Sequence, residues 1–146
     1  QVRVIRLESA GGRVAKARGL AKLVRRMALD TSASVECSSA CTLVLLSGRT
    51  RYLEPGARLG FHQYGLHSPL IGIFVDPAAE QARDEALFGH HEIDPAFMAQ
   101  VAETPHREMW FPWPDELLEA GVVDVLGRPD TAPAALSDPA GSLLPR

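Results

Sequence analysis

The fold of this chain is decided by the stretch Val35-Glu36-Cys37-Ser38-Ser39-Ala40-Cys41-Thr42-Leu43-Val44-Leu45-Leu46. Residues 33–37 favour a short strand, and the apolar residues 40–46 predict a buried helix. Ser39 lies at the corner between them. A hydroxyl at such a corner sits beside the first amides of a helix, which suits a nucleophile and suits a plain N-cap equally well.

Two cysteines, Cys37 and Cys41, flank this corner. They are too few for a zinc site, which needs four ligands. Two interpretations stay open at this point. A disulfide across one helical turn would imply an oxidising compartment. Two small, buried and reduced side chains that pack a tight corner are the alternative, and we slightly prefer it.

Length and composition set broad limits on the function. A chain of 146 residues fits one domain. The net charge of −3 is too weak to predict a nucleic-acid or membrane partner, and no apolar run approaches the ~20 residues of a membrane span. Because the chain starts at Gln1 without a methionine or a signal peptide, we expect a processed chain that is truncated at its N-terminus.

The order of the predicted elements indicates an α/β domain with a mainly parallel sheet and flanking helices. We expect this domain over residues 1–126 and a disordered, Pro- and Ala-rich tail over 127–146. The predicted strands are 2–7, 33–37, 51–53, 57–61 and 122–125, and the predicted helices are 13–27, 40–46, 77–88, 94–102 and 115–120, with a turn at 30–32 and loops at 65–76 and 110–114.

Several residues could carry chemistry. His62 ends the predicted strand 57–61, where sites of α/β proteins gather, but an ordinary strand-end histidine is the more common case. To activate Ser39, its imidazole must come within ~3 Å of the hydroxyl. The other four histidines, two of them in predicted loops, have no metal-ligand spacing such as H-E-x-x-H, so we expect no metal: His67, His90, His91 and His106. Gly11-Gly12 forms a tight turn without the G-x-G-x-x-G spacing of a dinucleotide site, and we expect no cofactor.

Taken together, the motifs are more specific. They occur in the order Ser-Ala-Gly-Gly-Arg-Val at 9–14, Cys-Ser-Ser-Ala-Cys at 37–41, Gly-Phe-His-Gln at 60–63 and Glu-Ala-Gly-Val-Val-Asp at 119–124. This pattern resembles the ClpP/crotonase superfamily, and is most similar to predicted periplasmic ClpP-like proteins of bacteria. The resemblance covers residues 4–124. It implies a fold of repeated β-β-α units and a serine peptidase activity.

The resemblance also implies a role for each matching residue. Ser39 matches the nucleophile, His62 the general base, and the backbone N–H groups of Gly12 and Ala40 the oxyanion hole. The orienting aspartate of the family has no counterpart in residues 103–106. Glu103 could take its place, Ser39 and His62 could act as a dyad, or catalysis could be lost.

The implied partner is a peptide or protein substrate, in a periplasmic or secreted protein that forms a homo-oligomer. Two other functions compete with the hydrolase. The missing aspartate favours a non-catalytic binding or assembly module of the same fold. A crotonase-like acyl-CoA enzyme has less support, because the chain is short and a Ser/His pair suits hydrolysis better.

Overall fold

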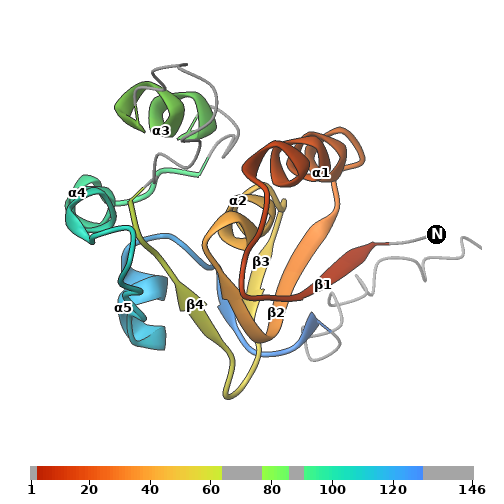
Figure 1. Cartoon of the computed structure of the whole chain (residues 1–146). Coiled ribbons are helices and arrows are strands. Elements are labelled where there is room, and N and C mark those ends of the chain that lie inside the picture. Colours follow the sequence, from red (N-terminus) through yellow and green to blue (C-terminus); the bar gives the residue numbers. More distant parts are fainter. Residues whose placement is uncertain (1–2, 64–76, 86–90, 130–146) are drawn as a thin grey trace, which may run out of the picture.

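The computed structural model describes residues 3–63, 77–85 and 91–129 of the chain. They form a parallel five-stranded sheet with flanking helices, which confirms the predicted α/β class (Figure 1). The elements follow the order β1 (Val4–Ser9), α1 (Val14–Arg26), β2 (Asp30–Ser38), α2 (Ala40–Leu46), β3 (Arg51–Leu53), β4 (Arg58–Gly60), α3 (Pro77–Glu85), α4 (Pro95–Glu103), α5 (Pro114–Glu119) and β5 (Val125–Leu126).

Strand β2 organises the sheet because it pairs with three other strands. β1 runs along one side of it, while β3 and then β4 pair with successive halves of its other side. In the second half, Ser38 lies opposite Gly60 in a parallel register. The carboxyl ends of β2 and β4 therefore meet at the same edge of the sheet, so that Ser39 and His62, which follow those ends, come close together.

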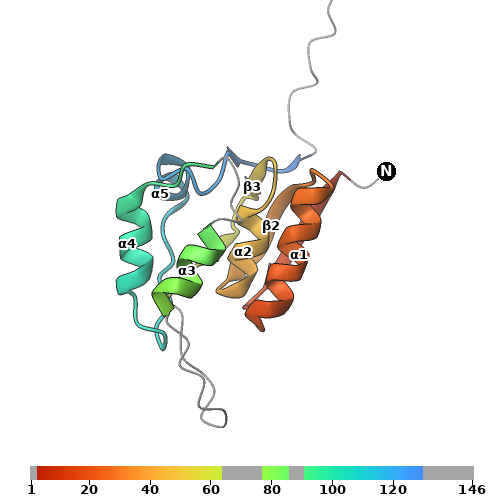
Figure 2. The ribbon, with the colours of Figure 1, turned by 90° about the horizontal axis from the view of Figure 1, so that it is seen from above.

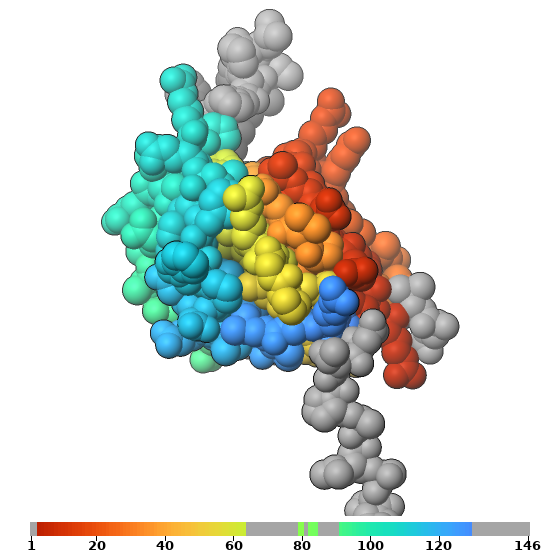
Figure 3. Space-filling model, turned by 90° about the horizontal axis from the view of Figure 1, so that it is seen from below, coloured from red at the N-terminus to blue at the C-terminus, as the bar shows by residue number. Residues whose placement is uncertain are grey.

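Helices α1, α2 and α3 lie on one side of the sheet, while α4 and α5 lie beside β4 (Figure 1). In Figure 2, α4, α3, α2 and α1 follow one another from left to right. Figure 3 shows the molecule from below, where segments coloured from red to yellow lie beside the teal, cyan and blue residues of the C-terminal half. The site described below lies at the edge of the sheet between α2 and α4.

Helix α2 lies at the centre of the hydrophobic core. All seven of its residues are buried, as expected for a helix that is apolar on every side. Helix α1 packs on it through its buried face, which includes Ala21 and Val24, and exposes Lys16, Lys22, Arg25 and Arg26. Because α2 is enclosed by the sheet and α1, the corner that precedes it has a fixed position.

One sequence prediction was wrong at residues 30–32, which we expected to form a turn. These residues instead begin β2. Their polar side chains are satisfied inside the protein: the Thr31 hydroxyl donates to the carbonyl of Leu45 at 2.7 Å, and that of Ser32 donates to Glu54 at 2.8 Å. A buried strand can carry polar residues when each finds a partner, and local propensity does not show this.

The last strand and the tail also differ in part from expectation. Strand β5 spans two residues rather than 122–125, because Val122 and Val123 are buried in the core without joining the ladder. At the start of the predicted tail, the Gly127 N–H donates to the Leu53 carbonyl at 2.8 Å. The predicted loop 65–76, the end of the predicted helix 77–88 and residues 130–146 lie outside the described residues.

Candidate active site

Ser39 occupies a strained corner between β2 and α2. Its backbone has φ 55° and ψ −125°, a conformation that a non-glycine residue rarely adopts. The Ser39 N–H donates to the carbonyl of Gly60 at 2.8 Å, and the side chain forms no capping hydrogen bond. Ser39 therefore occupies the N-cap position of α2 without capping the helix, and its hydroxyl is directed to another partner.

The Gly-Gly turn after β1 leaves space for this corner. Gly11 has φ 118°, and a Cβ placed there would lie 2.9 Å from the Cβ of Ser39. A side chain at this position would be strained and would collide with the serine. The glycine thus permits the close approach of the turn to the proposed nucleophile.

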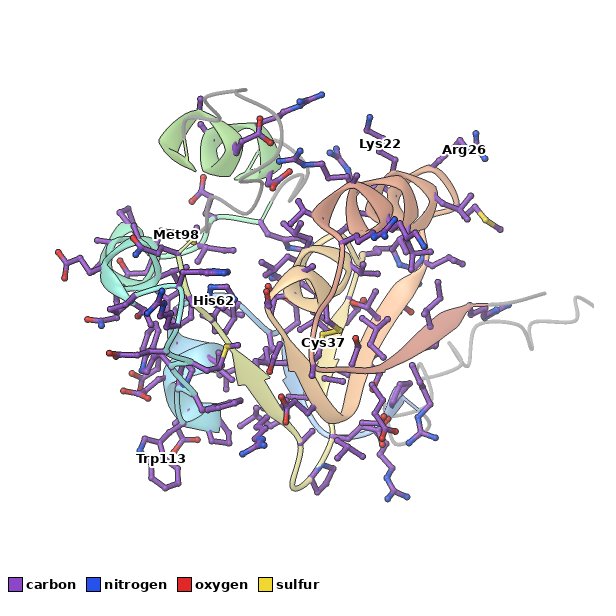
Figure 4. The ribbon with its side chains drawn as sticks, in the orientation of Figure 1. Lys22, Arg26, Cys37, His62, Met98 and Trp113 are labelled. Carbon is purple, nitrogen blue, oxygen red and sulfur yellow. A yellow bond between two sulfur atoms is a disulfide. The ribbon has the colours of Figure 1, made fainter. Side chains whose placement is uncertain are left out.

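A disulfide between Cys37 and Cys41 joins the end of β2 to the first turn of α2. The slight preference for two reduced cysteines was therefore wrong. The bond, drawn in yellow in Figure 4, spans the strained Ser39 and closes the corner covalently. Since disulfides persist in oxidising compartments, this observation bears on where the protein works.

His62 lies within hydrogen-bonding distance of the serine. Its Nε2 is 2.8 Å from the Oγ of Ser39, and its Nδ1 is 2.7 Å from the carbonyl oxygen of Gln63. Because a carbonyl can only accept, Nδ1 carries the proton and donates it, and Nε2 is left free to accept from the hydroxyl. This is the tautomer that a general base requires. Figure 4 shows His62 between the end of β4 and the start of α2.

The surroundings of His62 lower its pKa. Burial is the largest cause, the Gln63 carbonyl acts in the opposite direction, and the neighbouring His106 lowers the pKa further. A low-dielectric site disfavours the charged form of an imidazole. At neutral pH His62 is therefore neutral and able to take a proton from Ser39.

The segment that follows α4 fixes the backbone on both sides of His62. Phe61 and Trp110 exchange two backbone hydrogen bonds of 2.9 Å, and the Gln63 N–H donates to the Thr104 carbonyl at 2.9 Å. The rings of Phe61 and Trp110 also pack with that of Phe97. Residues 104–110 are thus tied to the strand end that carries the base.

This segment brings His106, and not Glu103, to the base. The Nδ1 of His106 is 3.2 Å from the Nδ1 of His62, with ring centroids 4.8 Å apart. Glu103 is exposed at the end of α4, and no hydrogen bond or ion pair joins it to His62 in the described part of the chain. Glu103 is therefore not the residue that contacts His62. The sequence did not point to His106 for this role, although His106 lies in the same four-residue stretch that lacks the aspartate.

A cavity of about 380 Å³ opens beside the Ser39–His62 pair. Gly12 and Ala40 line its polar end, and within the described residues their backbone N–H groups donate to no acceptor. Both amides are therefore available to an oxyanion. The rest of the wall is mostly apolar and includes Val14, Leu43, Leu46, Ile93, Phe97, Met98 and Val101.

The remaining histidines build no second site in the described residues. His91 places its Nε2 2.7 Å from the Gly48 carbonyl, and His67 and His90 lie outside the described ranges. Over 3–63, 77–85 and 91–129, no three His, Cys, Asp or Glu side chains cluster as metal ligands would. Nor does this part of the chain contain a helix whose length and hydropathy would let it cross a membrane.

Comparison with known proteins gives no family. No protein-family model matches the chain, and no curated protein is significantly similar to it. The resemblance to the ClpP/crotonase superfamily stays a prediction that rests on the four sequence motifs.

Proposed function

We propose that this protein is a serine hydrolase of the ClpP-like type, with Ser39 as nucleophile and His62 as general base. The observation that carries the proposal is the 2.8 Å contact between the Ser39 hydroxyl and the Nε2 of a neutral, half-buried histidine. A serine at a strained strand-to-helix corner, beside a base of the correct tautomer, has the arrangement that acyl transfer needs.

The proposed reaction proceeds through an acyl-enzyme. The Oγ of Ser39 attacks the substrate carbonyl carbon while His62 Nε2 takes the hydroxyl proton. The negative charge that develops on the carbonyl oxygen is held by the N–H groups of Gly12 and Ala40, and one such donor contributes about 10²–10³-fold in rate. The C–N bond then breaks as His62 returns the proton to the leaving amine. Water, deprotonated by His62, releases the acid from Ser39 in the reverse sequence.

The proposed substrate is a peptide or protein with an apolar side chain beside the scissile bond. The support for this choice is the apolar part of the cavity, formed by Leu43, Phe97 and Val101, while the charged side chain of Arg13 lines the cavity next to Gly12. An acidic or basic side chain placed against the three apolar residues would lose its hydration without gaining a partner there. A long aliphatic or aromatic side chain fits this wall.

A fluorophosphonate probe tests the proposal directly. The Ser39 oxygen forms a bond to phosphorus, fluoride leaves, and His62 takes the proton. We expect labelling of the folded protein, loss of labelling in Ser39→Ala, and normal labelling in Ser34→Ala. Ser34 is a matched control, because it lies on the same strand and its only described side-chain bond is a weak 3.3 Å contact to the Leu7 carbonyl. A folded wild-type protein that resists the probe would contradict the proposal.

Substrate choice can be tested with reversible inhibitors. A peptide boronate with a leucine side chain should protect Ser39 from the probe at lower concentration than its aspartate counterpart. Equal protection by the two would argue against an apolar subsite while leaving the serine chemistry intact.

The competing functions are weighed by the same geometry. The short Ser39–His62 contact favours hydrolysis over a non-catalytic module, and no observation favours an acyl-CoA enzyme. The Cys37–Cys41 disulfide supports the proposed periplasmic or secreted location. A homo-oligomer remains a prediction of the resemblance.

A further inference from the structure

We infer that His106 is the positioning residue of this site, occupying the place where an orienting carboxylate would otherwise stand. The inference rests on the proposed function of Ser39 and His62. Its basis is the 3.2 Å approach of the two Nδ1 atoms and the exposure of Glu103, the carboxylate that the sequence offered instead.

The hydrogen-bond geometry assigns a protonation state to His106. The Nδ1–H of His62 faces two acceptors at once, the Gln63 carbonyl at 2.7 Å and the Nδ1 of His106 at 3.2 Å. Since that proton already belongs to His62, the Nδ1 of His106 must accept, which places the proton of its neutral ring on Nε2. One shared proton thus holds the His62 ring with Nε2 turned toward Ser39.

The attachment of the surrounding backbone makes this contact a property of the fold. His106 lies within the segment that is tied to Phe61 through Trp110 and to Gln63 through Thr104. Both ties flank the base, so the segment cannot shift without moving His62 as well. With His106 Nδ1 as a second acceptor, the rotation of the His62 ring is more restricted than it would be by the Gln63 carbonyl alone.

A histidine in this place differs from a carboxylate in its charge. A carboxylate would favour the imidazolium form of His62 and raise its pKa, whereas the neutral ring of His106 accepts the hydrogen bond without a full negative charge. During the reaction, the imidazolium of His62 forms a stronger, charge-assisted bond to the same acceptor. His106 therefore supports the transition state while the resting base stays neutral.

The contact depends on the lone pair of His106 Nδ1, so a side chain without an acceptor at this place should orient His62 less well. The other charged side chains on the elements around the pair are exposed, and no described hydrogen bond or ion pair joins any of them to His62: Arg13, Glu103, Arg107 and Glu108.

The experiment measures the rate of fluorophosphonate labelling of Ser39 against pH. In the wild type, the rate should fall toward acid pH as His62 takes up a proton. In His106→Ala the rate at neutral pH should drop roughly 10- to 100-fold, less than the ~10⁴-fold for an orienting carboxylate because the Gln63 carbonyl remains.

Two further variants separate a positioning role from a structural one. His106→Asn keeps an acceptor, so it should label faster than His106→Ala. His106→Asp adds a charge, so the midpoint of its acid limb should lie at higher pH than in the other variants. Thermal unfolding of each variant reports on the fold independently.

The possible failures are distinguishable. If the wild type is not labelled, the proposed function fails. If the wild type is labelled and His106→Ala keeps its rate, the role of His106 alone is overturned. Equal labelling rates in His106→Ala and His106→Asn, together with a wild-type midpoint in His106→Asp, would also overturn it, because they would show a purely structural contribution.

Discussion

The two halves of the proposed site are built in different ways. Ser39 lies on a corner closed by the Cys37–Cys41 disulfide and followed by a fully buried helix. His62 lies beyond the end of a three-residue strand, held by hydrogen bonds and ring packing to residues 104–110. The nucleophile is fixed by covalent and core contacts, whereas the base is fixed by a segment from elsewhere in the chain. Damage to the first half should affect stability, and damage to the second should affect pH dependence.

The largest effect is expected where the two halves meet, at Gly60. A Cβ at this position would collide with the hydroxyl of Ser38 and lie 2.9 Å from the side chain of Met109. Gly60→Val should therefore push β4 away from β2 and lengthen the Ser39–His62 contact. Because a displacement of about 1 Å at a reacting centre costs roughly 10²-fold, we expect fluorophosphonate labelling to slow at least that much.

A glycine without such neighbours provides the control. A Cβ at Gly19, in the interior of α1, would meet nothing within 4 Å. Gly19→Ala should leave labelling unchanged and stabilise the protein by up to about 1 kcal/mol, since alanine is the better helix former. If Gly60→Val labelled as fast as Gly19→Ala, the two halves would not depend on the close contact of their strands.

A smaller effect is expected from removal of the disulfide. The double variant Cys37→Ala/Cys41→Ala opens a short loop, for which chain entropy predicts a loss of about 2 kcal/mol in the free energy of unfolding. Denaturant unfolding measures this value. The wild type should lose a similar amount under reducing conditions, and the double variant should not respond to the reductant. Equal stability of the two proteins would mean that core contacts alone hold the corner.

The smallest effect concerns the base. Burial lowers the pKa of His62 below the ordinary value of about 6.5, so its neutral form persists to lower pH than in an exposed histidine. The labelling rate should hold through neutral pH and fall only as the pH drops below about 6.5. His91→Gln should keep the same midpoint, because His91 bonds to Gly48 and does not touch His62. A midpoint above neutral pH would contradict the predicted environment of His62.

Sequence reasoning performed well where the pattern is local. Residues 40–46 form the predicted buried helix, and the corner at Ser39 follows from a strand signal that meets this apolar run. Hydrophobic periodicity predicts which residues are buried, and burial determines the structure of these elements. The turn predicted at 30–32 was wrong because the hydrogen-bond partners that let Thr31 and Ser32 lie in a buried strand are 14 and 22 positions away in the sequence.

The third member of the site was beyond local reasoning. The sequence showed that residues 103–106 lack an aspartate, and charge suggested Glu103. The choice depends on which side chain the Phe61–Trp110 and Gln63–Thr104 hydrogen bonds turn toward the base, and these contacts join segments more than 40 positions apart. A search of that stretch for any ring nitrogen, and not for a carboxylate alone, would have included His106.

The register of β4 on β2 has a consequence for how this site can vary. Ser38 faces Gly60, so the spacing between the serine and the histidine is set by which residue of one strand opposes which residue of the other. A slip by one residue would move the histidine by about 3.3 Å and turn every side chain of the strand to the opposite face. Insertions or deletions between Leu53 and Arg58 therefore have one of two outcomes. Those that change only the turn leave the Ser39–His62 contact intact, and those that shift the register of β4 abolish it.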